Sequence, residues 1–64
     1  MIKNYSCFIH RPQKSVPNFL AVTCAGADRA LVHAERVASE WNDWWVIEIY
    51  EGDRRVVKRE RGFS

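Results

Sequence analysis

Residues 44–59 read WWVIEIYEGDRRVVKR, and this stretch decides the fold. Its first half, residues 44–51, is rich in β-branched and aromatic residues, which favour a β-strand. Gly52 and Asp53 are typical of a tight turn, and residues 54–59 predict a second strand that folds back on the first. Residues 44–51 are apolar at both odd and even positions, so this strand is expected to place apolar side chains on both faces of a sheet.

Two further strands and a helix precede this hairpin. Residues 4–11 (NYSCFIHR) and 18–24 (NFLAVTC) alternate with period two, and the proline-containing segment 12–17 separates them as a loop. After Gly26 the apolar spacing changes to three and four, which predicts an amphipathic helix. Its stripe comprises Ala27, Ala30, Leu31, Ala34, Val37, Ala38 and Trp41.

The two ends of this helix have their own signals. Asp28 suits the first turn, as the N-cap or one or two residues inside it, because a carboxylate there meets exposed N–H groups. The helix is expected to end near Trp41, and Asn42 suits the left-handed position that follows a helix.

The order ββαββ predicts an α+β fold: a two-layer sandwich with one helix on one face of a four-stranded, mainly antiparallel sheet. All 64 residues form a single domain in this prediction, with residues 61–64 as a loose tail. If the third strand docks beside the first, every neighbouring pair is antiparallel and the strand order is 2-1-3-4. Docking beside the second strand makes one pair parallel. We favour 2-1-3-4 because small mixed sheets are less common.

One helix covers only one face of such a sheet. The covered face is expected to hold Tyr5, Cys7, Ile9, Leu20, Val22, Trp45, Ile47 and Ile49. The uncovered face then carries an apolar set, Phe8, Phe19, Trp44, Val46 and Tyr50, among Ser6, His10, Ala21 and Glu48. Each large ring leaves about 150–250 Å² to be buried, and together they exceed what a soluble monomer usually exposes. The apolar set is therefore the predicted interface.

The favoured hypothesis is a non-enzymatic protein–protein interaction module, which forms a homodimer by packing this face against a second copy. Another protein or a peptide would satisfy the same physics. Alternatively, the C-terminal tail with Phe63 covers part of the face.

Single-stranded nucleic acid is the alternative ligand, because aromatic side chains stack on bases and basic side chains hold phosphates. The candidate phosphate contacts are Arg11, Lys14, Arg54, Arg55, Lys58 and Arg59. A net charge of only +2 and the nearby acids Glu48, Glu51 and Asp53 argue against it. Charges on the last strand are also explained by protection of a sheet edge.

The sequence predicts no catalytic residues, no cofactor and no metal site. The soft ligands Cys7, His10, Cys24 and His33 match no zinc spacing. Both cysteines are expected to point inward, as small buried thiols do. The N-terminal residues lack the apolar stretch of a signal peptide, and no run approaches a membrane span of about 18 residues. We therefore expect a cytoplasmic protein with reduced thiols.

The C-terminal two-thirds of the chain carries a recognisable pattern. A helix with Asp28, Leu31, Ala34 and Ala38 is followed by residues 46–57, VIEIYEGDRRVV, in which an aromatic precedes an acid-Gly-Asp turn and an Arg-apolar strand. This pattern resembles a broad group of very small, uncharacterised bacterial proteins. The resemblance implies a ββαββ fold and no activity, so it transfers no functional residue.

Overall fold

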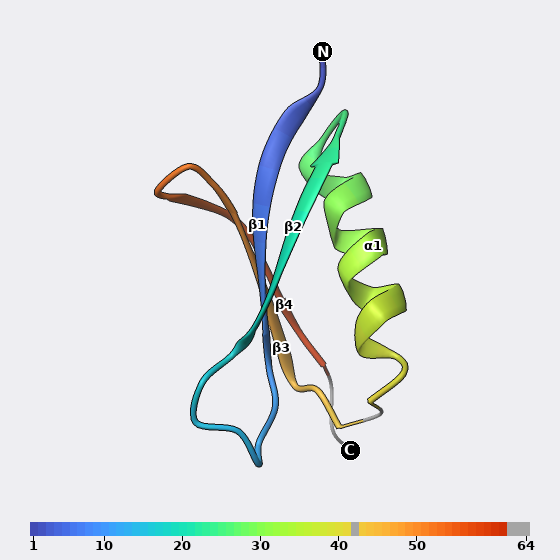
Figure 1. The fold of residues 1–64 in the computed structure, drawn as a ribbon, viewed down its shortest axis with the longest axis vertical. Helices are drawn as coiled ribbons and strands as arrows, with labels where there is room; N and C mark the ends of the chain where they lie inside the picture. Colours follow the sequence, from blue (N-terminus) through green and yellow to red (C-terminus); the bar gives the residue numbers. More distant parts are fainter. Residues whose placement is uncertain (42, 62–64) are drawn as a thin grey trace.

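The computed structural model describes residues 1–41 and 43–61, which form one sheet and one helix. The elements are β1 (Lys3–His10), β2 (Asn18–Cys24), α1 (Ala27–Ala38), β3 (Val46–Glu51) and β4 (Arg54–Glu60). The strand order is β2-β1-β3-β4, and every neighbouring pair is antiparallel. The helix α1 lies along one face of the twisted sheet (Figure 1). The predicted two-layer α+β sandwich and its strand order are confirmed.

The core lies between α1 and the two central strands. Fully buried side chains come from β1 and β3: Cys7, Ile9, Ile47 and Ile49. Three alanines of α1 face them, namely Ala30, Ala34 and Ala38. Because alanine has the shortest apolar side chain, this stripe lets the helix lie close to the sheet. The alanines recur every four residues, which keeps them on one side of the helix.

The ends of α1 differ partly from expectation. The carbonyl of Gly26 accepts hydrogen bonds from the N–H groups of Arg29 and Ala30, and Asp28 lies in the first turn. The helix ends at Ala38, earlier than expected, and single turns continue to Trp41. The side chain of Ser39 donates to a carbonyl of the last turn and so supports this early end. Asn42, predicted to follow the helix in a left-handed conformation, lies outside the described residues.

The adjacent tryptophans are placed opposite to expectation. Trp44 is only 9% exposed and belongs to the core, whereas Trp45 is 47% exposed. The prediction of Trp44 in the interface and Trp45 under the helix was wrong. The reason is that β3 begins at Val46, so strand alternation does not govern the two preceding side chains. The guanidinium of Arg61 lies 5.4 Å from the centroid of the Trp44 ring and covers it from outside.

Arg61 also fixes the end of the described chain. Its N–H donates to the carbonyl of Trp45 at 2.8 Å, and its guanidinium donates to the carbonyl of Trp44 at 3.4 Å. The rest of the predicted tail, residues 62–64 with Phe63, lies outside the described residues. Within residues 1–41 and 43–61, no helix has the length and apolarity needed to cross a membrane.

The tryptophan pair gives a matched stability test. We expect Trp44→Ala to lower the free energy of unfolding by about 3–5 kcal/mol, because it empties a core position. Trp45→Ala removes an exposed ring and is expected to change the free energy of unfolding by less than about 1 kcal/mol. Urea unfolding followed by far-ultraviolet circular dichroism measures both. Equal losses in the two variants would contradict this placement.

Candidate functional site

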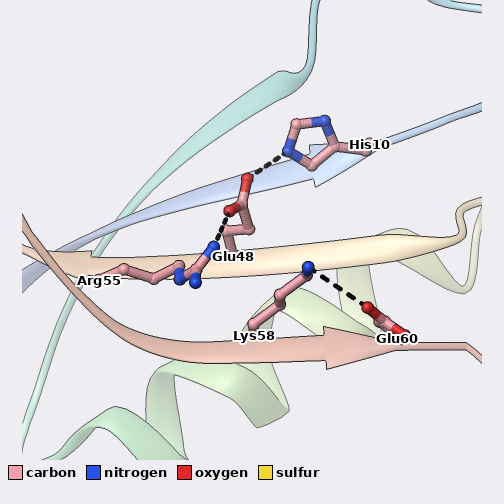
Figure 2. A network of polar contacts seen from close by, with 5 residues as sticks. All are labelled: His10, Glu48, Arg55, Lys58 and Glu60. Carbon is pink, nitrogen blue, oxygen red and sulfur yellow. Dashed lines mark hydrogen bonds and ion pairs between the residues drawn. The ribbon is translucent and has the colours of Figure 1, made fainter.

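The face of the sheet turned away from α1 is the candidate site, and we call it the open face. It takes side chains from all four strands. They are Ser6, Phe8 and His10 of β1; Phe19, Ala21 and Thr23 of β2; Val46, Glu48 and Tyr50 of β3; and Arg55, Lys58 and Glu60 of β4. Figure 2 shows the charged members of this set projecting from the sheet on the side opposite the helix.

Three aromatic rings form a cluster on the open face. Phe8 lies at its centre, 5.5 Å from the ring of Phe19 in a tilted arrangement and 5.5 Å from the ring of Tyr50, edge to face. Phe8 and Phe19 are directly opposite each other on β1 and β2, which brings the two rings together. Phe19 remains 61% exposed. Val46 shares this face, so four of the five predicted interface residues are on one surface; Trp44 is not.

A hollow of about 350 Å³ lies beside this cluster. It is lined by Ser6, Phe8, His10, Pro17, Glu48, Tyr50, Gly52 and Asp53. In Figure 1 the β3–β4 turn and the loop between β1 and β2 both bend away from α1, toward the open face. Pro17 and Gly52 come from these two segments, so the open face is concave. The sequence predicted the apolar rings but not this shape, because loop direction has no periodic signal.

Glu48 is the centre of a charged network on the same face. His10 Nε2 donates to its Oε1 at 2.7 Å, and Arg55 donates to its Oε2 at 3.0 Å (Figure 2). The hydrogen bond from Arg55, followed by that from His10, holds the pKa of Glu48 below its usual range although partial burial acts in the opposite direction. Lys58 and Glu60 form a second pair at 3.3 Å. The carboxylate in the middle of this apolar face is therefore satisfied within the chain.

The predicted phosphate contacts are divided between several surfaces. Arg55 and Lys58 lie on the open face, each paired with a carboxylate. Arg59 points to the other side, where it lies 3.7 Å from Glu35 of α1. Arg54 and Lys14 are exposed, near the β3–β4 turn and in the first loop respectively. The six candidates do not form one continuous basic patch.

Arg11 has a structural environment that the sequence did not indicate. Its guanidinium donates two hydrogen bonds to Asp43, at 2.8 and 3.3 Å, and lies 5.0 Å from the centroid of the Trp41 ring. The hydrogen bond from Arg11 lowers the pKa of Asp43. This contact ties the end of β1 to the segment that enters β3. Its partners are far apart in sequence, so only the strand order brings them together.

The remaining candidate ligands give no second site. Cys7 is buried, Cys24 is partly buried, and both are free thiols. Burial raises the pKa of the Cys7 thiol. The Cys24 thiol donates to the carbonyl of Gly26 at 3.2 Å. In the described part of the chain, no three His, Cys, Asp or Glu side chains are grouped so that they can hold a metal ion.

No protein-family model matches this chain, and comparisons with curated proteins and with solved structures give no match either. The geometry and chemistry of the open face are therefore the basis for assigning a function.

Replacing Glu48 tests the charged network. Its lowered pKa means that its contribution to stability is present above the ordinary glutamate range and disappears as the pH falls through the folded-state pKa. We expect Glu48→Gln to lower the free energy of unfolding at neutral pH by about 1–2 kcal/mol, through loss of charge-assisted hydrogen bonds. The variant's stability also falls less steeply than that of the wild type at acid pH.

Glu60→Gln is the matched control for this experiment. Glu60 lies on the same face, but its side chain is 68% exposed and its ion pair with Lys58 is open to solvent. Exposed pairs contribute little, typically below about 1 kcal/mol. Urea unfolding between neutral and acid pH compares the three proteins. Identical pH profiles for the wild type and Glu48→Gln would show that the network does not stabilise the fold.

Proposed function

We propose that this protein is a non-enzymatic protein–protein interaction module that acts through the open face and forms a homodimer there. The observation that carries the proposal is the cluster of Phe8, Phe19 and Tyr50 on a sheet face that no second layer covers within the described residues. Apolar rings on an uncovered sheet face are stabilised when a partner removes them from water. We further propose a cytoplasmic setting, in which the two free thiols stay reduced.

The arrangement of apolar and charged groups supports association. Protein interfaces combine a central aromatic patch with a polar rim. Here the rings lie over β1, β2 and β3, while the pairs Glu48–Arg55 and Lys58–Glu60 extend toward β4. Because these charges are paired within the chain, a partner can cover them without leaving a single charge buried and unpaired.

The balance of charge favours a second copy as the partner. The strand residues of the open face include two carboxylates, Glu48 and Glu60, and two cations, Arg55 and Lys58. Their charges balance, and Asp53 at the edge of the hollow adds one negative charge, so two identical faces repel each other little. The face also has a projecting ring, Phe19, and a hollow. A two-fold axis can place the projecting ring of each copy toward the hollow of the other, as a self-complementary interface requires.

The size of the open face sets the expected affinity of the homodimer. Four strands about 4.8 Å apart and six to eight residues long give a footprint of about 400 Å². Because side chains project from the sheet, the area buried on association is larger than this footprint. It approaches about 600 Å² per partner, the lower end of the range for stable protein–protein interfaces. The open face alone is therefore expected to form a weak dimer whose population depends on protein concentration.

Single-stranded nucleic acid is the second candidate. Arg55 and Lys58 share the open face with the rings, and rings beside cations are the arrangement that stacks bases and holds phosphates. Both cations are already paired with carboxylates, which also repel phosphate. We therefore place this function second.

Sedimentation equilibrium from micromolar to millimolar concentration tests the proposed homodimer. We expect Phe8→Ser with Tyr50→Ser to weaken open-face association by about tenfold or more, because central rings dominate such interfaces. Trp45→Ser is the matched control: it removes an exposed ring that precedes β3 and makes none of the contacts of the Phe8 cluster, so it is expected to leave association unchanged.

Two results would count against this proposal. One is a wild-type protein that stays monomeric at millimolar concentration; the other is equal association of the wild type and the double variant. A fluorescent single-stranded oligonucleotide, titrated at low ionic strength, separates the second candidate. Salt-sensitive binding that Arg55→Gln with Lys58→Gln abolishes would favour nucleic acid instead.

A further inference from the structure

The two edge strands of the sheet are protected very differently. β4 has charged side chains at five of its seven positions, and its pairing with β3 is irregular at Ile49 and Tyr50. Charges and bulges both hinder the addition of another strand. β2 has no charged residue and no proline among its seven positions, and its pairing with β1 runs without a register shift. The outer side of β2 therefore offers unpaired backbone groups to an added strand.

The apolar layer under α1 is also left open at this edge. The helix-facing side chains of β1 and β3 are fully buried, but Leu20, Val22 and Cys24 of β2 are only partly buried. A second hollow, distinct from the one on the open face, is lined by Cys24 of β2 and Val32 of α1, and Val32 is 54% exposed. A strand added beside β2 extends this layer and removes more of these side chains from water.

We propose that β2 pairs antiparallel with β2 of a second copy, so that the two sheets continue into one another. A two-fold axis perpendicular to the sheet relates the copies and keeps both helices on the same side. The register that pairs the whole strand places Ala21 opposite its own counterpart. It also sets Leu20 opposite Val22 in the helix-facing layer and Phe19 opposite Thr23 on the open face.

Charge and symmetry select a second copy as the added strand. Two β2 strands bring no like charges together, because neither carries any. Pairing of β2 with β4 of another copy would build an endless sheet, and the charges and irregular pairing of β4 oppose it. Pairing of β2 with itself closes after two copies, as an isologous interface does.

This interface is separate from the proposed open-face dimer and does not depend on it. If both form, two joined sheets pack through their open faces into a closed tetramer with the helices outside. Edge pairing also places two copies of Phe19 on one continuous surface, which enlarges the small footprint of a single open face.

Hydrogen exchange of backbone amides, measured by NMR, tests the edge pairing. In an unpaired antiparallel edge strand, amides at alternate positions point to solvent and exchange quickly. We expect these outward amides of β2 to become protected, by about tenfold or more, as the protein concentration rises. The outward amides of β4 stay fast at every concentration and are the internal control.

Charge substitutions identify the edge responsible. Ala21→Lys brings two ammonium groups together at the two-fold axis, so the concentration-dependent protection of β2 is expected to disappear. Val56→Lys places the same charge at an exposed position of β4 and is expected to leave the concentration-dependent protection of β2 intact. If Ala21→Lys fails to fold, Thr23→Lys replaces it: this exposed position of β2 faces Phe19 of the second copy, and a charge on an edge strand hinders strand addition.

The outcomes separate the two interfaces. The edge proposal is overturned if outward β2 amides exchange as fast as those of β4 at millimolar concentration, or if their protection survives the lysine substitutions. If the protein dimerises while the outward β2 amides still exchange quickly, the open-face proposal remains valid. Conversely, protection of β2 together with a mass unaffected by Phe8→Ser and Tyr50→Ser supports the edge and removes the open-face dimer.

Discussion

A single twelve-residue helix can cover only one side of a four-stranded sheet, and the other features of this structure depend on that limit. The strand order places β1 and β3 in the centre, and both carry large apolar side chains on each of their two sides. Ile9 and Ile47 face the helix, while Phe8 and Tyr50 face away from it. The same two strands therefore build the core and the exposed aromatic cluster, and a change of register by one residue would exchange them.

Local periodicity was enough to predict the elements and the architecture. Short segments carry these signals: the alternation in residues 4–11 and 18–24, and the stripe of alanines. Such local patterns do not depend on how the rest of the chain packs. The strand order followed from one further constraint, that every pair in this small sheet be antiparallel. Four residues of the open face, Phe8, Phe19, Val46 and Tyr50, then followed from side-chain alternation alone.

Other parts of the site were beyond this reasoning because they depend on contacts between distant segments. The segment before β3 has no period, so nothing local indicated that Trp44 turns into the core and Trp45 does not. The contacts of His10 with Glu48 and of Arg11 with Asp43 require the register between β1 and β3. Loop direction, which makes the open face concave, is set by the same long-range packing.

The placement of charge links the face to the edges. The basic C-terminal segment would give a polyanion site if its cations shared one free surface, but Arg55, Lys58 and Arg59 each lie beside a carboxylate. On β4 these cations oppose strand addition, and Arg55 and Lys58 also balance the acids of the open face. No such charges occur on β2. The edge at β4 is thus closed by residues that also neutralise the open face. The edge at β2 keeps unpaired backbone groups and uncharged side chains, which a second β2 strand can pair with and cover.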